Sequence, residues 1–281
     1  MMWKEIYRLG VEHIDAQHKK LFETAGELIQ EIEGAQRPEV YKRTIKFLQE
    51  YVVVHFRDEE AYFKSLHFAN GAEHIKQHQE ITQAVQKYVM ELESSAYASH
   101  VIKKMAGMLS AWLIYHVVKE DLQYTGKAKQ EPSQNECSYM EHFTNSTIQV
   151  LEAMVGLNPA DVDKAKIYDN LSKDDVFIEI GLVGDLKGRV VFGFTKEFSS
   201  RLVESMMSFA PDEIDELVCS ALSEVSNIAS GKGTIAMSEE GIACDICPPK
   251  VLQNSLEAFP PHEEVRIDTK IGKMTIAVYL D

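Results

Sequence analysis

Residues 54–60 read Val-His-Phe-Arg-Asp-Glu-Glu, and residues 73–78 read Glu-His-Ile-Lys-Gln-His. His55 and Glu59 in the first stretch are four residues apart, and His74 and His78 in the second have the same spacing. Residues four apart leave the same face of an α-helix. The two stretches therefore predict two helices, each of which presents a pair of potential metal ligands on one side.

The apolar residues on either side of these stretches recur at spacings of three and four, which is the period of an amphipathic helix. They predict four helices, over residues 15–33, 40–66, 72–93 and 99–124. Gly34 ends the first, and Pro38 suits the first turn of the second. Four such helices with short connections predict an all-α antiparallel four-helix bundle.

The outer two helices add further candidate ligands. His18 lies on the first helix, and His116 and Asp121 lie on the fourth. A single histidine on an apolar face is usually structural, but burying five imidazoles and two carboxylates without a metal would be costly. Nitrogen and oxygen donors without a thiolate suit iron. If two carboxylates bridge two metals, the five nitrogens divide three and two, and one metal keeps an open position for a small molecule.

The complete set of seven residues resembles the ligand pattern of the hemerythrins over about residues 10–125: His18, His55, Glu59, His74, His78, His116 and Asp121. The resemblance implies two non-haem iron ions with an oxo or hydroxo bridge, Glu59 and Asp121 as bridging ligands, and dioxygen as the bound molecule. It assigns no ligand role to three other histidines, which we expect at the surface or its boundary: His13, His67 and His100. We expect Trp112 to shield the cluster.

The second half of the chain has a different pattern. Helices are expected over 136–156, 196–207 and 211–229, the last brought to an end by Gly231 and Gly233. Strands are expected over 176–180 and 189–194, around 241–247 and near 265–280. Hairpins mixed with helices predict an α+β domain. The domains are therefore expected at 1–126 and 136–281. The polar segment 127–135, which follows Gly126 and contains Pro132, is expected to be the linker.

Ser220, Glu224 and Asn227 recur at spacings of four and three, so they share one helix face. Alone, such a pattern is typical of a solvated surface. Together with Gly231, however, it resembles the signature of the CheC/CheX chemotaxis phosphatases, and its single copy favours the CheX-like type. The resemblance covers about residues 138–281.

This second resemblance implies hydrolysis of the aspartyl phosphate of a CheY-like response-regulator receiver domain, which supplies its own Mg²⁺. Asn227 is the candidate for orienting the attacking water, because a carboxamide accepts a hydrogen bond without a shifted pKa. Glu224 is expected to pair with a receiver lysine. CheX-like proteins form dimers, so a homodimer through this domain is expected.

The composition limits the other classes of function. The 281 residues include 44 acidic and 29 basic side chains, a net charge of −15, which disfavours nucleic acid and anionic membranes as partners. The start lacks the apolar region of a signal peptide, and no apolar run reaches the ~18 residues of a membrane span. Four cysteines do not make a disulfide framework, so the cytoplasm is expected. Cys244 and Cys247 are expected to be structural, because a zinc site needs a second pair.

The leading hypothesis is an oxygen- or redox-sensing di-iron protein that dephosphorylates a receiver domain. A rival hypothesis is a protein for oxygen or iron storage whose second domain only docks to a partner. A third makes the di-iron site an enzyme that reduces peroxide or nitric oxide. An Asn227→Ala variant separates the first from the second, and turnover of peroxide or nitric oxide tests the third.

Overall fold

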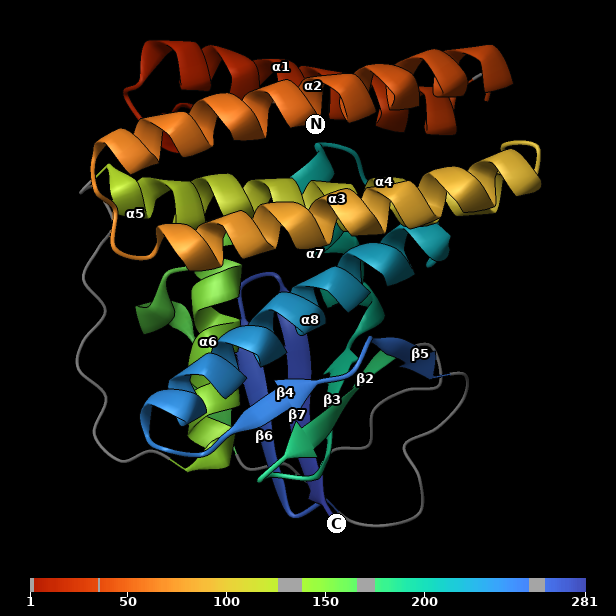
Figure 1. Cartoon of the computed structure of the whole chain (residues 1–281). Helices are drawn as coiled ribbons and strands as arrows, with labels where there is room; N and C mark the ends of the chain where they lie inside the picture. Colours follow the sequence, from red (N-terminus) through yellow and green to blue (C-terminus); the bar gives the residue numbers. More distant parts are fainter. Residues whose placement is uncertain (1–2, 35, 126–137, 166–174, 253–260) are drawn as a thin grey trace. The chain divides into compact units, whose positions relative to one another are not determined.

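The computed structural model describes residues 3–34, 36–125, 138–165, 175–252 and 261–281 (Figure 1). The chain divides into two compact units, Met1–Gln130 and Glu131–Asp281. The predicted linker at 127–135 lies outside the described residues.

Long antiparallel helices build the described part of the first unit. They are α1 (Glu12–Glu33), α2 (Pro38–Ser65), α3 (Gly71–Ser94) and α4 (Ser99–Tyr115), preceded by the short 3₁₀ helix η1 (Glu5–Tyr7). Both α1 and α3 pack against α2 and α4. The predicted four-helix bundle is therefore confirmed.

The interior of the bundle is apolar along most of its length. Phe22, Leu28 and Ile32 of α1 are almost completely buried, as are Leu92 of α3 and Ile102 of α4. Burial of such side chains supplies the main stabilisation, at about 1.5–3 kcal/mol each. The stretch Ser99–Tyr124 is long and apolar enough to cross a membrane, but 78% of its most apolar window is buried inside the structure, as in the core helix of a bundle.

The fourth predicted helix, over 99–124, is not one regular α-helix. After α4 the chain forms a π-helix, η2 (His116–Asp121), and then a last short helix, α5 (Leu122–Tyr124). In an α-helix, residues five apart are separated by about 140° around the axis. The wider π-helical turn brings residues five apart onto one side. This local irregularity is what allows His116 and Asp121 to face the same centre.

The second unit combines helices with one antiparallel sheet. The helices are α6 (Tyr139–Val155), α7 (Lys196–Met207) and α8 (Glu216–Glu239), with the short 3₁₀ helix η3 (Pro159–Asp161). The strands are β1 (Asp163–Ala165), β2 (Val176–Gly184), β3 (Gly188–Phe194), β4 (Cys244–Ile246), β5 (Lys250–Leu252), β6 (Glu263–Thr269) and β7 (Gly272–Leu280). The predicted α+β class is confirmed.

The strand order is β1-β6-β7-β3-β2-β4, and β5 pairs with a different part of β2. The central pair, β3 and β7, is buried over most of its length, and α6 and α7 pack against β7 while α8 packs against β2 and β4. The β2–β3 hairpin turns between Gly184 and Gly188, both of which have positive φ angles. Glycine is needed there because an added Cβ would collide with neighbouring backbone.

The predicted helix at 211–229 is wrong at both ends. Asp215 caps the observed helix, because its carboxylate accepts hydrogen bonds from the backbone of Leu217 and Val218. The helix then continues through Gly231 and Gly233 to Glu239. Helix propensity is a weak preference that packing overrides, and here α8 packs along α6.

Candidate metal centre and candidate phosphatase face

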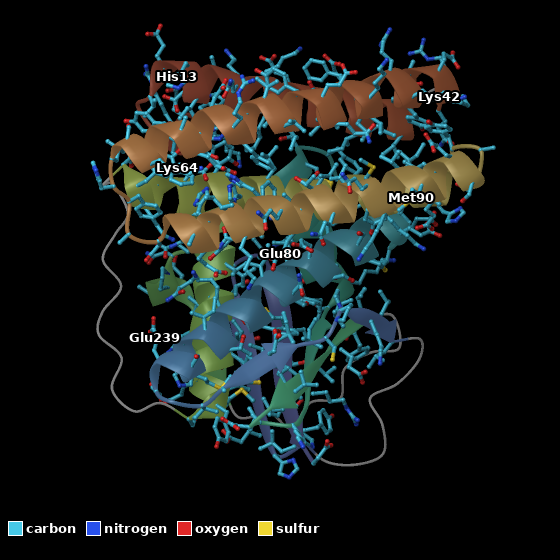
Figure 2. The ribbon with its side chains drawn as sticks, in the orientation of Figure 1. His13, Lys42, Lys64, Glu80, Met90 and Glu239 are labelled. Carbon is cyan, nitrogen blue, oxygen red and sulfur yellow. The ribbon has the colours of Figure 1, made fainter. Side chains whose placement is uncertain are left out.

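All seven predicted metal ligands meet inside the bundle. They come from α1, α2, α3 and the π-helical segment η2, and each is at most 3% exposed. The outer side of the bundle is polar, with exposed side chains such as Lys42, Lys64 and Glu80 (Figure 2). Ionised carboxylates buried at this depth are expected to need positive charge beside them.

One part of the cluster contains two histidines. Nε2 of His18 lies 3.1 Å from Nε2 of His55, and these atoms lie 3.9 Å and 3.7 Å from the two carboxylate oxygens of Glu59. The three residues can offer ligand atoms that lie within 4.8 Å of one another. They therefore outline a first position for a metal ion.

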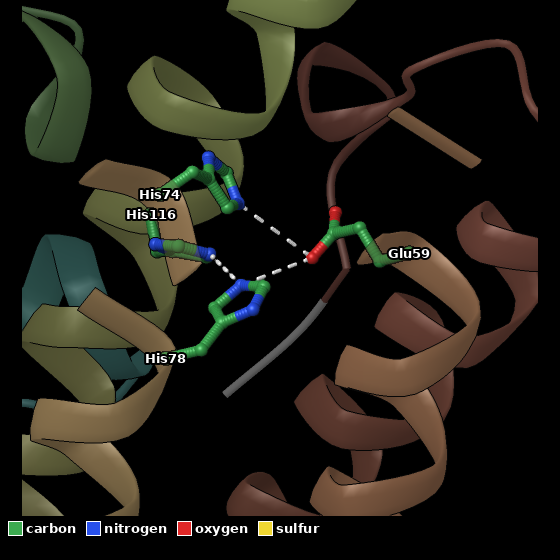
Figure 3. Close-up of side chains that lie close together, drawn as sticks. All are labelled: Glu59, His74, His78 and His116. Carbon is green, nitrogen blue, oxygen red and sulfur yellow. Dashed lines mark hydrogen bonds and ion pairs between the residues drawn. The ribbon is translucent and has the colours of Figure 1, made fainter. Parts of the chain in front are cut away.

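The other part contains three histidines (Figure 3). Nε2 of His78 lies 3.2 Å from Oε2 of Glu59 and 3.0 Å from Nε2 of His116, and Nε2 of His74 lies 3.8 Å from Oε2 of Glu59. These residues outline a second metal position. Because Glu59 belongs to both groups, its carboxylate is placed as a bridge.

Asp121 also spans the two groups. One oxygen lies 3.2 Å from Nε2 of His18, and the other lies 3.3 Å and 3.0 Å from Nε2 of His74 and His116. The structure thus reproduces the division into three and two nitrogens with two shared carboxylates. The ligand roles themselves stay a prediction.

The outer ring nitrogens indicate which inner nitrogens can bind a metal. Nδ1 of His55 lies 3.1 Å from the amide oxygen of Gln17, and Nδ1 of His78 lies 3.4 Å from a carboxylate oxygen of Glu60. An oxygen acceptor at Nδ1 favours the tautomer that carries its proton there. The Nε2 lone pairs of both rings are then free to face the centre.

The carboxylates also fit a cationic group. Oε2 of Glu59 and both oxygens of Asp121 are buried, and none of them has a hydrogen-bond partner within the part of the chain that the structure describes. Burial acts to raise the pKa of both groups, but the surrounding imidazoles hold it below its ordinary value, so both are ionised. Ionised oxygens without donors in a buried site fit a pair of metal ions.

Aromatic rings surround the cluster, and one of them was not predicted. The hydroxyl of Tyr124 donates a hydrogen bond to Oε1 of Glu59 at 2.5 Å. Burial raises the pKa of this hydroxyl far above its ordinary value. Phe56 stacks on His78 with 3.8 Å between the ring centroids, and Trp112 stacks on His116 with 4.2 Å between them. The second contact agrees with the expected shielding role of Trp112. Tyr124 follows Asp121 by three residues, and this helical spacing is the sequence pattern that could have indicated its position beside the cluster.

The histidines without an expected ligand role lie at the surface. His13, His67 and His100 are all exposed. Gln17 and Glu60, which contact the outer nitrogens of two ligands, were not singled out from the sequence. Each is next to a ligand in the chain, beside His18 and Glu59, and only the fold shows which ring it contacts.

The second candidate site lies on α8. Ser220, Glu224 and Asn227 are half-buried on the side of α8 opposite the core-facing residues, such as Val225 and Ala229. Desolvation raises the pKa of Glu224 to about 7, although a hydrogen bond with Asn227 acts in the opposite direction. A carboxylate and an amide are therefore held side by side where a partner can reach them.

Three cysteines fall among the described residues, and all are free. Cys244 and Cys247 are half-exposed on and just after β4, and Cys219 lies on α8. Sγ of Cys247 would lie 3.2 Å from a Cβ at Gly181, so this thiol packs closely on β2. This packing agrees with a structural role for Cys247.

Comparison with known families assigns a class to each unit. Residues 9–128 match the hemerythrin HHE cation binding domain, and residues 176–267 match the chemotaxis phosphatase CheX. The chain therefore consists of a hemerythrin domain followed by a CheX domain.

Two curated relatives correspond to these parts. A bacteriohemerythrin of Clostridium acetobutylicum is 25% identical over 126 residues, which are 44% of this chain and 97% of the relative. The CheY-P phosphatase CheX of Thermotoga maritima is 25% identical over 108 residues, which are 38% of this chain and 70% of the relative. Among solved structures, CheX of Vibrio vulnificus matches with a TM-score of 0.46 and 19% identity, over 53% of this chain and all of that chain.

Proposed function

We propose that this protein senses oxygen or redox state at a di-iron centre and dephosphorylates the aspartyl phosphate of a CheY-like receiver domain. The observation that carries the first half is the convergence of five histidine side chains and two carboxylates, each at most 3% exposed, inside the bundle. The second half rests on the CheX family match and on the half-buried pair Glu224 and Asn227 on one side of α8.

The residues divide the work of holding two ions. His74, His78 and His116 would hold one iron, His18 and His55 would hold the other, and Glu59 and Asp121 would bridge them. An oxo- or hydroxo-bridged pair of iron ions would supply reversible binding of dioxygen and a change of redox state. The side with two histidines offers fewer protein ligands, so a small molecule is expected to bind there.

The protein matrix controls what reaches this centre. Phe56 and Trp112 cover the rings of His78 and His116, and Tyr124 fixes the orientation of Glu59. A small neutral molecule can pass through such packing more readily than an ion, because burying a charge is costly. The arrangement thus suits a ligand such as dioxygen.

The chemistry on α8 is one of positioning. The acyl phosphate of a receiver is already reactive, and the receiver brings Mg²⁺, so the phosphatase mainly has to place a water in line with phosphorus. Asn227 would accept a hydrogen bond from this water, and the carboxylate of Glu224 would pair with a lysine of the receiver. No nucleophile of this chain takes part.

The phosphatase proposal is tested by the lifetime of a phosphorylated CheY-like receiver with and without the protein. The protein is expected to shorten it, and Asn227→Ala is expected to lower the rate about 100-fold or more. Rates that are equal for the variant and the unchanged chain would favour the rival interpretation, in which the second domain only docks.

The sensing proposal is tested by the metal content, by the visible spectrum with and without air, and by the receiver assay in diferrous and diferric protein. Two irons per chain, a chromophore that responds to oxygen, and rates that differ between the two states are expected. Equal rates in both states would make the two domains independent modules. Sustained turnover of peroxide or nitric oxide would instead indicate an enzymatic di-iron site. Dimer formation and a cytoplasmic location remain predictions.

A further inference from the structure

Two glycines in α8 have different surroundings. A Cβ at Gly233 would lie 2.8 Å from Cδ1 of Phe143, so the packing of α8 on α6 requires glycine there. A Cβ at Gly231 would meet only Cδ1 of Ile246, at 3.7 Å, which is an ordinary van der Waals contact. The φ angle of Gly231 is not positive. Nothing in the described part of the chain therefore requires residue 231 to lack a side chain.

A glycine inside a helix is nevertheless unfavourable, because it lowers helix stability relative to alanine. Gly231 is half-exposed and lies within about 60° of Glu224 and Asn227 around the helix axis. At such a position a missing side chain allows another backbone to approach closely. The benefit of Gly231 is thus expected to lie in a contact with another molecule.

The same helix side ends in an exposed apolar residue. Ile235 is 53% exposed, although isoleucine is among the most frequently buried residue types. It lies eleven residues after Glu224, about 20° away around the axis and about 16 Å along it. Glu224 and Asn227, then Gly231, then Ile235 form a surface that is polar at one end, flat in the middle and apolar at the other end, called here the α8 stripe.

We propose that two further residues of the α8 stripe contact the receiver domain: Gly231 sets how closely the two backbones approach, and Ile235 contacts an apolar residue of the receiver. This inference rests on the proposed phosphatase function. The amide of Asn227 is short, whereas a receiver carries its phosphate in the crevice at the carboxyl ends of its strands. A side chain at 231, one turn from Asn227, would hold the amide away from the phosphoryl group.

The test measures binding of a CheY-like receiver loaded with beryllofluoride and Mg²⁺, together with dephosphorylation of the same receiver. Gly231→Leu is expected to raise the Kd and lower kcat/KM at least about tenfold. Gly231→Ala is expected to give a smaller change in the same direction, and Ile235→Ser is expected to raise the Kd. The melting temperature of Gly231→Ala should be unchanged or raised, because alanine favours the helix.

Two control variants separate docking from folding. Glu204→Leu places the same apolar side chain at an exposed position of α7 and should leave the Kd unchanged. Gly233→Ala should lower the melting temperature, because its Cβ would collide with Phe143. A docking role for Gly231 predicts the reverse, which is weaker binding without loss of stability.

The outcomes distinguish this inference from the proposed function. If the unchanged chain shortens the lifetime of the phosphorylated receiver and Gly231→Leu binds and acts equally well, the docking surface is wrong and the phosphatase stands. If the unchanged chain has no effect on that lifetime, the phosphatase proposal fails. Binding then decides separately: a Kd raised by Gly231→Leu supports the docking surface, and absence of binding by the unchanged chain overturns it.

Discussion

Tyr124 shows how a single side chain can fix the geometry of the metal centre. Its hydroxyl is buried and donates to one oxygen of Glu59, while the other oxygen of Glu59 faces His78. A hydrogen bond to a charged acceptor is stronger than one between neutral groups. Groups that orient a metal ligand in this way commonly affect metal affinity.

We therefore expect Tyr124→Phe to weaken iron binding about 10-fold or more, because the carboxylate of Glu59 loses the hydrogen bond that the hydroxyl of Tyr124 donates. Iron retention against a chelator and the position of the visible absorption bands measure the effect. Tyr62→Phe is the matched control, because its ring lies 5.9 Å from that of Tyr124 and keeps the same kind of packing. Equal losses in both variants would contradict the positioning role.

Receiver binding is expected to depend on pH through Glu224. Desolvation raises its pKa to about 7 from an ordinary 4.5, so the group is largely neutral below pH 7 and becomes charged above it. Since pairing with a receiver lysine needs the charged form, receiver binding is expected to weaken as the pH falls from 8 to 6. Glu224→Gln should bind weakly at both pH values. A Kd for the unchanged chain that is constant across this range would exclude the pairing.

Ionisation of Glu224 is expected to lower the stability of the fold, whereas it is expected to strengthen receiver binding. Because the pKa of Glu224 is raised on folding, its ionisation disfavours the folded state, and stability is lost as the pH rises from about 4.5 to 7. Glu224→Gln is therefore expected to be more stable than the unchanged chain at pH 8. Such residues, which lower stability and serve function, are typical of active sites.

Among the elements, α1 and α2 are joined near their connection by an ion pair between Glu31 and Arg37. The carboxylate of Glu31 near the end of α1 accepts hydrogen bonds from the backbone nitrogen and the guanidinium of Arg37, at 2.8–2.9 Å. Arg37 is the residue just before α2 begins. Glu31 thus replaces the capping side chain that α2 lacks.

The pKa of Glu31 follows from this contact. The hydrogen bonds from Arg37 lower it from 4.5 to about 2. A lowered carboxylate pKa gives a contribution to stability that is complete above about pH 4.5 and is lost as the pH falls towards 2. Glu31→Gln should therefore lower the melting temperature by about 2–4 °C at pH 7, and this difference should narrow below pH 4.5. A difference that stays constant between pH 7 and pH 3.5 would count against the ion pair.

At the scale of the whole molecule, iron is expected to stabilise only one of the two units. Its removal leaves the buried carboxylates of Glu59 and Asp121 with the surrounding imidazoles as their counter-charges in the described structure. A ligand at 100 times its Kd stabilises a fold by about 2.7 kcal/mol. Calorimetry is therefore expected to show two transitions, of which anaerobic chelation lowers one. His74→Ala identifies the bundle transition, and a chelator that shifts both transitions equally, or neither, would contradict a metal site confined to the bundle.

Much of this protein is determined by short-range patterns in the sequence. Spacings of three and four place the ligands on α1, α2 and α3 and the pair Glu224 and Asn227 on one side of α8, because a helix repeats locally whatever surrounds it. Glycines at 184 and 188 mark the β2–β3 hairpin for the same reason. These features need only neighbours in the chain.

The tertiary structure decided what depends on partners far away in the chain. The π-helical turn brings His116 and Asp121 to the same side, towards ligands from the other helices, and a spacing of five does not reveal it. The contacts of Gln17 with His55 and of Tyr124 with Glu59 join residues 38 and 65 positions apart. The glycines at 231 and 233 look alike in sequence, and only the structure shows that Phe143 packs against Gly233 whereas a Cβ at Gly231 would make an ordinary contact with Ile246. The helix period determines the direction in which each side chain leaves its own helix, whereas packing determines which residue that side chain meets across the core.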